Sequence, residues 1–247
     1  MNFTVVGYWH GYPEAGEATS GYLLEANGYR VLIDCGSGVI SNLARYISVN
    51  DVDAVVLSHH HHDHAADAQV LHYHRILRHY NEGGERPLTI YTHDEDEAFA
   101  NQLSAPPFVE RGTYTSEAPL QLGPFQFTFT KSDHPVPTYA MRVEHTDGTL
   151  FYTADTGYMA ELAEAGKDAD LFVAECSLYA GQDGSHIGHI NSEEAAKLAE
   201  QANAKQLLLT HLPHFGNHED LQTEASKVFS GTVDVAVSGW TFSFTKS

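Results

Sequence analysis

Basic residues are scarce in this sequence of 247 residues. Lys and Arg together number 13 against 33 Asp and Glu, which gives a formal net charge of −20 at pH 7. A protein that follows the phosphate backbone of a nucleic acid needs a broad basic surface. We therefore expect no extended nucleic-acid binding, and any contact with a nucleic acid would be local.

Cysteine and long apolar runs are also scarce. The two cysteines, Cys35 and Cys176, are too few for a disulfide framework and form no C-x-x-C pair, so we expect both to be reduced and buried. No run approaches the roughly 18 consecutive apolar residues of a membrane helix, and the first residues lack a basic region followed by an apolar core. We expect no membrane contact and a cytoplasmic location.

The rest of the composition is that of an ordinary globular protein, with 42% hydrophobic, 19% charged and 11% aromatic residues. The length fits one large domain or two small ones. Because no low-complexity linker interrupts the sequence, we predict a single domain over residues 1–247.

Short apolar runs separated by turn residues predict strands along most of the chain. The first half has candidate strands over residues 3–6, 21–25, 30–33, 54–57 and 88–91, and a helix over 65–80 closed by a turn over 81–84. A second group of strands is predicted over residues 125–130, 139–144 and 149–153, the last two joined by an Asp147-Gly148 hairpin. Strands and helices then alternate: strand 171–174, a helix capped by Asn191 and Glu194, strand 206–210, helix 219–229, and strands 233–237 and 241–244. With residues 103–119 as an irregular loop, this order predicts an α/β fold of two packed sheets with helices outside.

Histidine is unusually abundant, with 17 copies against 13 of Lys and Arg together, and it clusters in Val55-Val56-Leu57-Ser58-His59-His60-His61-His62-Asp63-His64. An apolar strand thus runs into a loop that holds five imidazoles and one carboxylate, which are metal ligands. Alternate residues of an extended segment face the same way, so His59 and His61 can share one metal ion while Asp63 and His64 reach a second. His60 and His62 fall at the other positions, which predicts that they point away from the metal ions.

The pattern His59-x-His61-x-Asp63-His64 after an apolar strand resembles the metal-binding motif of the metallo-β-lactamase superfamily. That resemblance implies an αββα sandwich of two mixed β-sheets flanked by helices. Further segments match the family in the expected order: Ile33-Asp34-Cys35-Gly36-Ser37-Gly38, His134, Phe151-Tyr152-Thr153-Ala154-Asp155-Thr156-Gly157 and Leu207-Leu208-Leu209-Thr210-His211. The match covers essentially the whole chain.

The same resemblance implies the ligands of two divalent metal ions. One ion would be held by His59, His61 and His134, the other by Asp63, His64 and His211, with Asp155 between them. Imidazoles and carboxylates without a thiolate suit zinc, while manganese and iron also fit such ligands. Two cations about 3.5 to 4 Å apart can share and activate a water, so no Ser or Cys nucleophile is needed.

Within the superfamily, Val173-Ala174-Glu175-Cys176-Ser177 followed by Gly188-His189 and a helix resembles the ribonuclease Z branch, and so does His134-Pro135 with Arg142. This implies phosphodiester hydrolysis in which Glu175 and His189 form a proton-donating relay. We therefore expect Asp63, His189 and Glu175 to be catalytic residues. Between His64 and His134 the sequence shows no long basic arm of the kind that ribonuclease Z uses to hold transfer RNA. Small phosphodiesters or cyclic nucleotides are thus the expected substrates. Dimers are common in this branch, so a homodimer is one possibility, but no interface stripe is legible in the sequence and the oligomeric state stays open.

Two other functions stay open at this stage. The same metal ions could hydrolyse a thioester or a lactone, in which case His189 would matter less, or the chain could bind metal without turnover. The sequence also leaves open the roles of several other histidines: His10, in a loop with Tyr12, and His60, His62, His214 and His218.

Overall fold

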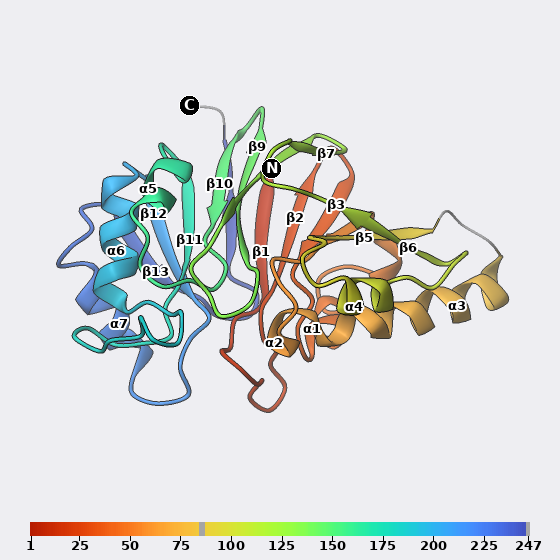
Figure 1. Cartoon of the computed structure of the whole chain (residues 1–247), viewed down its shortest axis with the longest axis horizontal. Helices are drawn as coiled ribbons and strands as arrows, with labels where there is room; N and C mark the ends of the chain where they lie inside the picture. Colours follow the sequence, from red (N-terminus) through yellow and green to blue (C-terminus); the bar gives the residue numbers. More distant parts are fainter. Residues whose placement is uncertain (84–86, 246–247) are drawn as a thin grey trace.

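The computed structural model describes residues 1–83 and 87–245. Two seven-stranded sheets pack face to face in the middle of the molecule, and helices cover their outer faces (Figure 1). The predicted αββα sandwich is therefore confirmed. The carboxyl ends of most strands lie along one edge of the sandwich, at the bottom of Figure 1.

The first sheet has the strand order β14-β1-β2-β3-β4-β5-β6. Its strands are β1 (Asn2–Gly7), β2 (Gly21–Ala26), β3 (Tyr29–Ile33), β4 (Ala54–Val56), β5 (Leu88–Thr92), β6 (Val109–Thr113) and β14 (Thr241–Ser243). The pairs from β14 to β3 are antiparallel, and those from β3 to β6 are parallel. Central β4 is covered on both faces, which explains its uniformly apolar sequence.

The second sheet repeats this arrangement with the order β13-β12-β11-β10-β9-β8-β7. Its strands are β7 (Leu120–Leu122), β8 (Phe125–Lys131), β9 (Tyr139–His145), β10 (Gly148–Tyr152), β11 (Leu171–Glu175), β12 (Gln206–Thr210) and β13 (Thr232–Val235). The pairs from β7 to β10 are antiparallel and those from β10 to β13 are parallel. Both sheets are therefore mixed.

Helices lie on the outer face of each sheet (Figure 1). The first sheet is flanked by α1 (Val39–Leu43), α2 (His62–Ala65), α3 (Val70–Glu82) and α4 (Glu97–Ala100), with 3-10 turns η1 (Val49–Asp51), η2 (Ala66–Gln69) and η3 (Asn101–Leu103). The second sheet is flanked by α5 (Glu161–Ala165), α6 (Ser192–Gln201) and α7 (His218–Ala225). Among the described residues, no helix has the length and apolar character that crossing a membrane requires.

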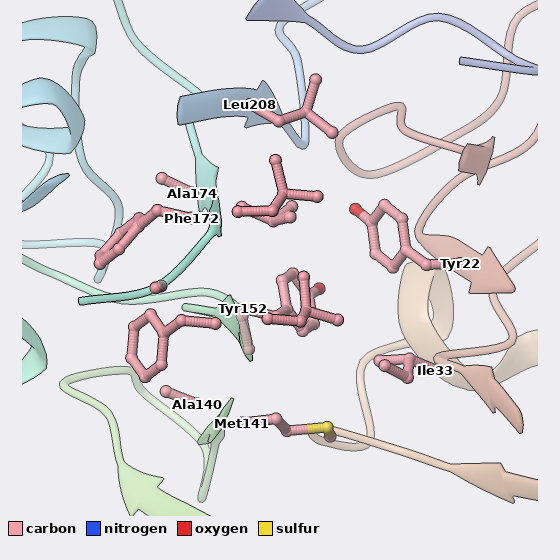
Figure 2. Packing of buried hydrophobic residues seen from close by; sticks show 14 of the residues in the cluster. Tyr22, Ile33, Ala140, Met141, Tyr152, Phe172, Ala174 and Leu208 are labelled. Atoms are coloured by element: carbon pink, nitrogen blue, oxygen red, sulfur yellow. The ribbon is translucent and has the colours of Figure 1, made fainter. Parts of the chain in front are cut away.

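The core between the sheets is apolar with a few buried hydroxyl groups. Figure 2 shows Tyr22 and Ile33 of the first sheet facing Tyr152, Met141 and Leu208 of the second. The hydroxyl group of Tyr22 lies 2.8 Å from Oγ1 of Thr210, so a hydrogen bond crosses the core. Buried polar atoms need such partners. This bond links the two sheets near the edge of the sandwich where most strands end.

Several predicted elements differ from the structure in their bounds. Residues 103–119 are not all irregular, because β6 pairs with β5 there and forms the edge of the sheet. This strand was missed because its sequence Glu-Arg-Gly-Thr is not buried and shows no apolar pattern. The predicted helix over 65–80 begins as η2 and continues as α3 to Glu82, and Gly84 of the predicted turn lies outside the described residues. Helix α7 ends at Ala225 instead of residue 229. The last strand, β14, joins the first sheet.

Candidate metal centre

Nearly all predicted site residues lie at or just beyond the carboxyl end of a strand. The segment with His59, His61, Asp63 and His64 follows β4, His134 follows β8, Asp155 follows β10, Glu175 ends β11, and His211 follows β12. His189 lies in the loop before α6. Because the strand ends meet at one edge of the sandwich, segments from both sheets converge there.

The loop after β4 is held tightly against its neighbours. His61 occupies the N-cap position of α2, and a single helical turn then carries Asp63 and His64. The backbone carbonyl of Asp63 accepts a hydrogen bond from Ser20, and that of His64 accepts one from Cys35. A Cβ atom on Gly36 would lie 2.0 Å from the Asp63 carbonyl oxygen, so only glycine permits this approach. Cys35 and Cys176 are both free and buried, as predicted.

The first group of predicted ligands converges around His61. Nδ1 of His61 lies 3.2 Å from Nε2 of His59 and 3.1 Å from Nε2 of His134. Oδ2 of Asp155 lies 3.7 Å from Nε2 of His59 and 4.0 Å from Nε2 of His134. Such distances between ligand atoms are typical of a group that surrounds one cation.

The second group lies on the other side of Asp155. Nε2 of His211 is 3.1 Å from Oδ2 of Asp63 and 3.5 Å from Oδ2 of Asp155. Nε2 of His64 is 3.2 Å from Oδ1 of Asp155, which is buried and has no well-formed hydrogen bond within the described residues. Asp155 therefore belongs to both groups, and the structure brings all seven predicted ligands together.

Hydrogen bonds behind the cluster orient two imidazoles from the first sheet. Nδ1 of His64 lies 2.8 Å from Oδ2 of Asp34, which can only accept when ionised, so Nδ1 carries the hydrogen. Ser58 donates its hydroxyl hydrogen to the same carboxylate at 2.9 Å and can then accept from Nδ1 of His59 at 3.0 Å. In the neutral form of each ring, Nε2 is then left with a lone pair that points into the cluster.

Hydrogen bonds to Nδ1 orient the imidazoles of the second sheet in the same way. Nδ1 of His134 donates to the carbonyl oxygen of Gly188 at 2.9 Å. Ser177 donates to Glu175 at 2.8 Å and accepts from Nδ1 of His211 at 3.0 Å. Lone pairs therefore converge from both sides at distances where they repel one another, and a cation relieves that repulsion. The donor set fits bound metal ions.

The electrostatics of the cluster lead to the same conclusion. Burial opposes a charge on His64, yet Asp155, Asp34 and Asp63 raise the pKa of its imidazole well above the ordinary value. Burial would raise the pKa of Asp155, but His211 and His64 hold it well below the ordinary value. The protein thus stabilises positive charge beside these carboxylates, which is the role of a metal cation.

Backbone strain gathers at the same place. Asp34, Ala154 and His211 have φ angles of 56°, 51° and 54°, in the left-handed region that costs non-glycine residues energy. Asp34 and His211 lie directly after a strand and Ala154 lies two residues after one, where the chain turns toward the cluster. Strain of this kind persists where surrounding contacts enforce it, as at binding sites.

A buried Glu–His pair lies beside the cluster. Nδ1 of His189 is 2.9 Å from Oε1 of fully buried Glu175. Burial lowers the pKa of His189, but the Glu175 carboxylate outweighs it and raises that pKa to about 9. The ring of His189 lies 5.2 Å from that of His134 and 5.5 Å from that of His211, between centroids. The pair can therefore present a protonated imidazole to the cluster at neutral pH.

The histidines whose roles were open fall into three places. His60 turns away from the cluster, with Nε2 2.6 Å from Oγ1 of Thr92, while His62 is exposed. His214, in the loop after His211, and His218, the first residue of α7, both pack on Trp9.

His10 lies nearer the site than these, stacked on His211 and His189. Burial lowers the pKa of His10 to about 3. Asp34, Ser58 and Ser177 were not predicted as functional residues, although each stands in one of the sequence segments that carry the motifs.

Comparison with known proteins agrees with this fold. A family model described as a β-lactamase superfamily domain matches residues 29–212. The chain is 46% identical over 240 residues to the probable metallo-hydrolase YhfI of Bacillus subtilis, covering 97% of this chain and 98% of that protein. The crystal structure of YhfI has a TM-score of 0.94 with 44% identity, covering 98% of each chain.

Two more distant proteins are also similar. A ribonuclease Z of Methanopyrus kandleri is 25% identical over 254 residues, covering 88% of each chain. A diphosphatase from the PhnP family shares the fold with a TM-score of 0.77 and 20% identity, covering 100% of this chain and 99% of that one. The family match, the extent of the similarity to YhfI and the two-sheet sandwich together show that the chain belongs to the metallo-β-lactamase superfamily of metallo-hydrolases.

Proposed function

We propose that this metallo-hydrolase hydrolyses small phosphodiesters with two bound metal ions. The observation that carries the proposal is the Glu175–His189 pair beside the cluster. Cleavage of a phosphodiester expels an alkoxide, which needs a proton, whereas a thioester expels a thiolate that leaves more readily. A buried, protonated imidazole at the cluster therefore favours the phosphodiester over the thioester.

The ligands proposed are those of the sequence analysis: His59, His61 and His134 for one ion, Asp63, His64 and His211 for the other, and Asp155 for both. Zinc suits this donor set best, and manganese or iron also fit. Two such ions, when bound, supply a water of lowered pKa and neutralise charge on the attacked phosphoryl group.

The roles proposed for the chain's own residues follow from their hydrogen bonds. Glu175 accepts the hydrogen of Nδ1 of His189 and keeps the imidazole protonated. The proton on Nε2 passes to the leaving oxygen as its bond to phosphorus breaks, and the imidazole becomes neutral. Asp63, proposed as both ligand and catalytic residue, is held by a 2.8 Å hydrogen bond from the backbone nitrogen of Gly11.

A small substrate is favoured over transfer RNA. The described residues between His64 and His134 form α3, β5, α4, β6, β7 and β8, without a separate arm. The net charge of −20 opposes a long polyanion, whereas a small anion feels mainly the bound cations. Similar proteins named as a ribonuclease and a diphosphatase support phosphate chemistry, and cyclic nucleotides are among the substrates we propose.

The test is hydrolysis of bis(4-nitrophenyl) phosphate by zinc- and manganese-loaded protein, with a lactone and a thioester in parallel. With a cyclic nucleotide, whose leaving group is an alkoxide, we expect His189→Ala to lose about 10²-fold or more in rate with unchanged metal content. His186→Ala, on an exposed histidine of the same loop, should leave the rate unchanged. Turnover of the lactone or thioester alone would contradict the proposal. Full metal content without turnover of any ester would indicate a non-catalytic metal-binding protein.

We also propose a homodimer, formed through α3. Val70, Tyr73, Leu77 and Tyr80 make one stripe on this helix and are 47%, 71%, 60% and 74% exposed. In an antiparallel pair of such helices, Val70 would face Tyr80 and Tyr73 would face Leu77, so the stripe is complementary to itself.

Charge and area are compatible with this dimer. Within α3 the acidic residue Glu82 is paired with Arg78 at 3.3 Å, so two copies of this acidic chain can approach here. The four stripe side chains expose roughly 500 Å² per copy, about half of a stable interface, so flanking residues would contribute the rest. Light scattering should show a dimer that Leu77→Asp converts to a monomer, while Val237→Asp, another exposed apolar position, does not. A wild-type monomer at high concentration would refute the dimer. The cytoplasmic location stays a prediction.

A further inference from the structure

The loop after β1 is fastened to the metal centre by its backbone. The nitrogen of His10 donates to the carbonyl oxygen of Leu212 at 3.1 Å, and Nε2 of His214 donates to the carbonyl oxygen of His10 at 2.9 Å. The nitrogen of Gly11 donates to Oδ2 of the proposed ligand Asp63 at 2.8 Å. These bonds hold His10 in place without using its side chain.

The His10 side chain lies over two imidazoles of the site. Its ring centroid is 4.6 Å from that of His211, at an interplanar angle of 27°, and 4.9 Å from that of His189. Among the described residues, neither ring nitrogen of His10 forms a hydrogen bond, although the ring is partly buried. Neither ring nitrogen is among the fully buried polar atoms that lack a partner, so both are accessible to a ligand from outside the chain.

Hydrogen-bond donors are scarce at the cluster, because the proposed ligands turn their lone pairs inward. His189 and His10 are the imidazoles packed on His211 that lie outside the proposed ligand sets. His189 is committed to Glu175 and to the leaving group under the proposed function. His10 can therefore donate to a phosphoryl oxygen that is not the leaving oxygen and that keeps its negative charge throughout the reaction.

We propose that His10 is a substrate-binding residue whose imidazole N–H donates a hydrogen bond to a non-bridging oxygen of a phosphoryl group held at the metal centre. This inference rests on the proposed function, since it takes a tetrahedral oxyanion as the bound group. The competing explanation is that the ring of His10 merely packs against His189 and His211 to keep them in place.

Three variants separate these explanations. His10→Phe keeps a flat ring for packing and removes the donor, whereas His10→Asn keeps a donor and removes the ring. His79→Phe is the matched control, because His79 is exposed on α3 and its ring packs on those of Tyr80 and Phe108, neither of which belongs to the site. The probe is inorganic phosphate, titrated by calorimetry into zinc-loaded protein of measured metal content.

If His10 binds the phosphoryl group, His10→Phe weakens phosphate binding about 10-fold or more, as expected for a lost hydrogen bond to a charged group, with unchanged metal content. His10→Asn recovers part of the affinity, and His79→Phe matches the wild type. With bis(4-nitrophenyl) phosphate, His10→Phe raises KM more than it lowers kcat. Wild-type phosphate affinity in His10→Phe would overturn the assignment, and so would loss of metal from it, because packing would then be its role.

The outcome is separable from that of the proposed function. If His10→Phe weakens phosphate binding but the wild type hydrolyses no phosphodiester, the proposed function fails and the oxyanion contact stands. If the wild type hydrolyses the diester and His10→Phe changes neither phosphate affinity nor KM, the function stands and the assignment of His10 is wrong.

Discussion

Asp34→Asn tests whether hydrogen bonds behind the cluster determine its metal affinity. The Asp34 carboxylate accepts from Nδ1 of His64 at 2.8 Å, from the backbone and hydroxyl of Ser58 at 2.7 and 2.9 Å, and from the hydroxyl of Tyr152 at 2.9 Å. Asn has nearly the same shape and tolerates the φ of 56° at this position. The substitution therefore changes hydrogen bonding with little change in packing.

The effect on His64 follows from donors and acceptors. The amide oxygen can still accept from the backbone of Ser58, and hydroxyl groups can turn to accept from the amide nitrogen. Nδ1 of His64 cannot adapt in this way, because its N–H would face the amide N–H of the new side chain. The ring relieves the clash by moving its hydrogen to Nε2, which removes the lone pair that faces Asp155. Loss of such an orienting partner typically lowers metal affinity 10- to 100-fold, or about 1.4 to 2.7 kcal/mol.

The assay is a competitive zinc titration of metal-free protein against a chromophoric chelator. We expect Asp34→Asn to weaken one of two binding steps by that factor and to leave the other step nearly unchanged. Tyr152→Phe is the control, because it removes one hydrogen bond to Asp34 and keeps the carboxylate. Unchanged affinity in Asp34→Asn would refute the argument from tautomers, and an equal loss in Tyr152→Phe would assign the effect to packing.

Three further outcomes follow from the geometry. The diesterase kcat should fall as pH rises through about 9, where His189 loses its proton. Glu175→Gln should move this fall more than one pH unit lower, and a pH profile without that shift would contradict the relay. Asn191→Ala removes the capping box of α6 and should lower the free energy of unfolding by about 1 kcal/mol in urea denaturation, whereas Asn191→Ser should retain most of it. Gly36→Ala places a Cβ atom 2.0 Å from the carbonyl oxygen of Asp63, so the purified variant should contain less metal than the wild type, and full occupancy would show that the loop can shift.

The two-sheet fold could be predicted because its central strands are short, apolar and bounded by turn residues. The start of α6 could also be predicted, since Asn191 and Glu194 form a capping box whose parts are close together in the sequence. One edge strand gave no such pattern: β6 carries the polar residues Glu110 and Arg111, whose side chains are not buried. Nor could local pattern show that β14 returns to pair with β1, since that pairing joins the two ends of the chain.

At the site, one dense motif pointed to metal ligands, and the family resemblance that it carried implied three more ligands after other strands. The residues that orient those ligands were harder to find. Ser177 hydrogen-bonds His211 across 34 positions, and Asp34 hydrogen-bonds His64 across 30. Nothing in a lone Ser or Asp identifies such a partner. His10 belongs to this class, because its place over His211 depends on how β1 and β12 are brought together in space.

The ligands are divided between the two sheets, and this ties metal binding to the packing of the sandwich. The first sheet contributes one continuous segment after β4, whereas the second contributes single residues after β8, β10 and β12. Neither sheet alone presents either proposed ligand set, since each set draws on both. Metal ions that bind only the packed state stabilise it by mass action, so chelation should lower the melting temperature of the whole sandwich. By the same linkage, loss of the hydrogen bond between Tyr22 and Thr210, which crosses the core next to His211, should lower metal affinity as well as stability.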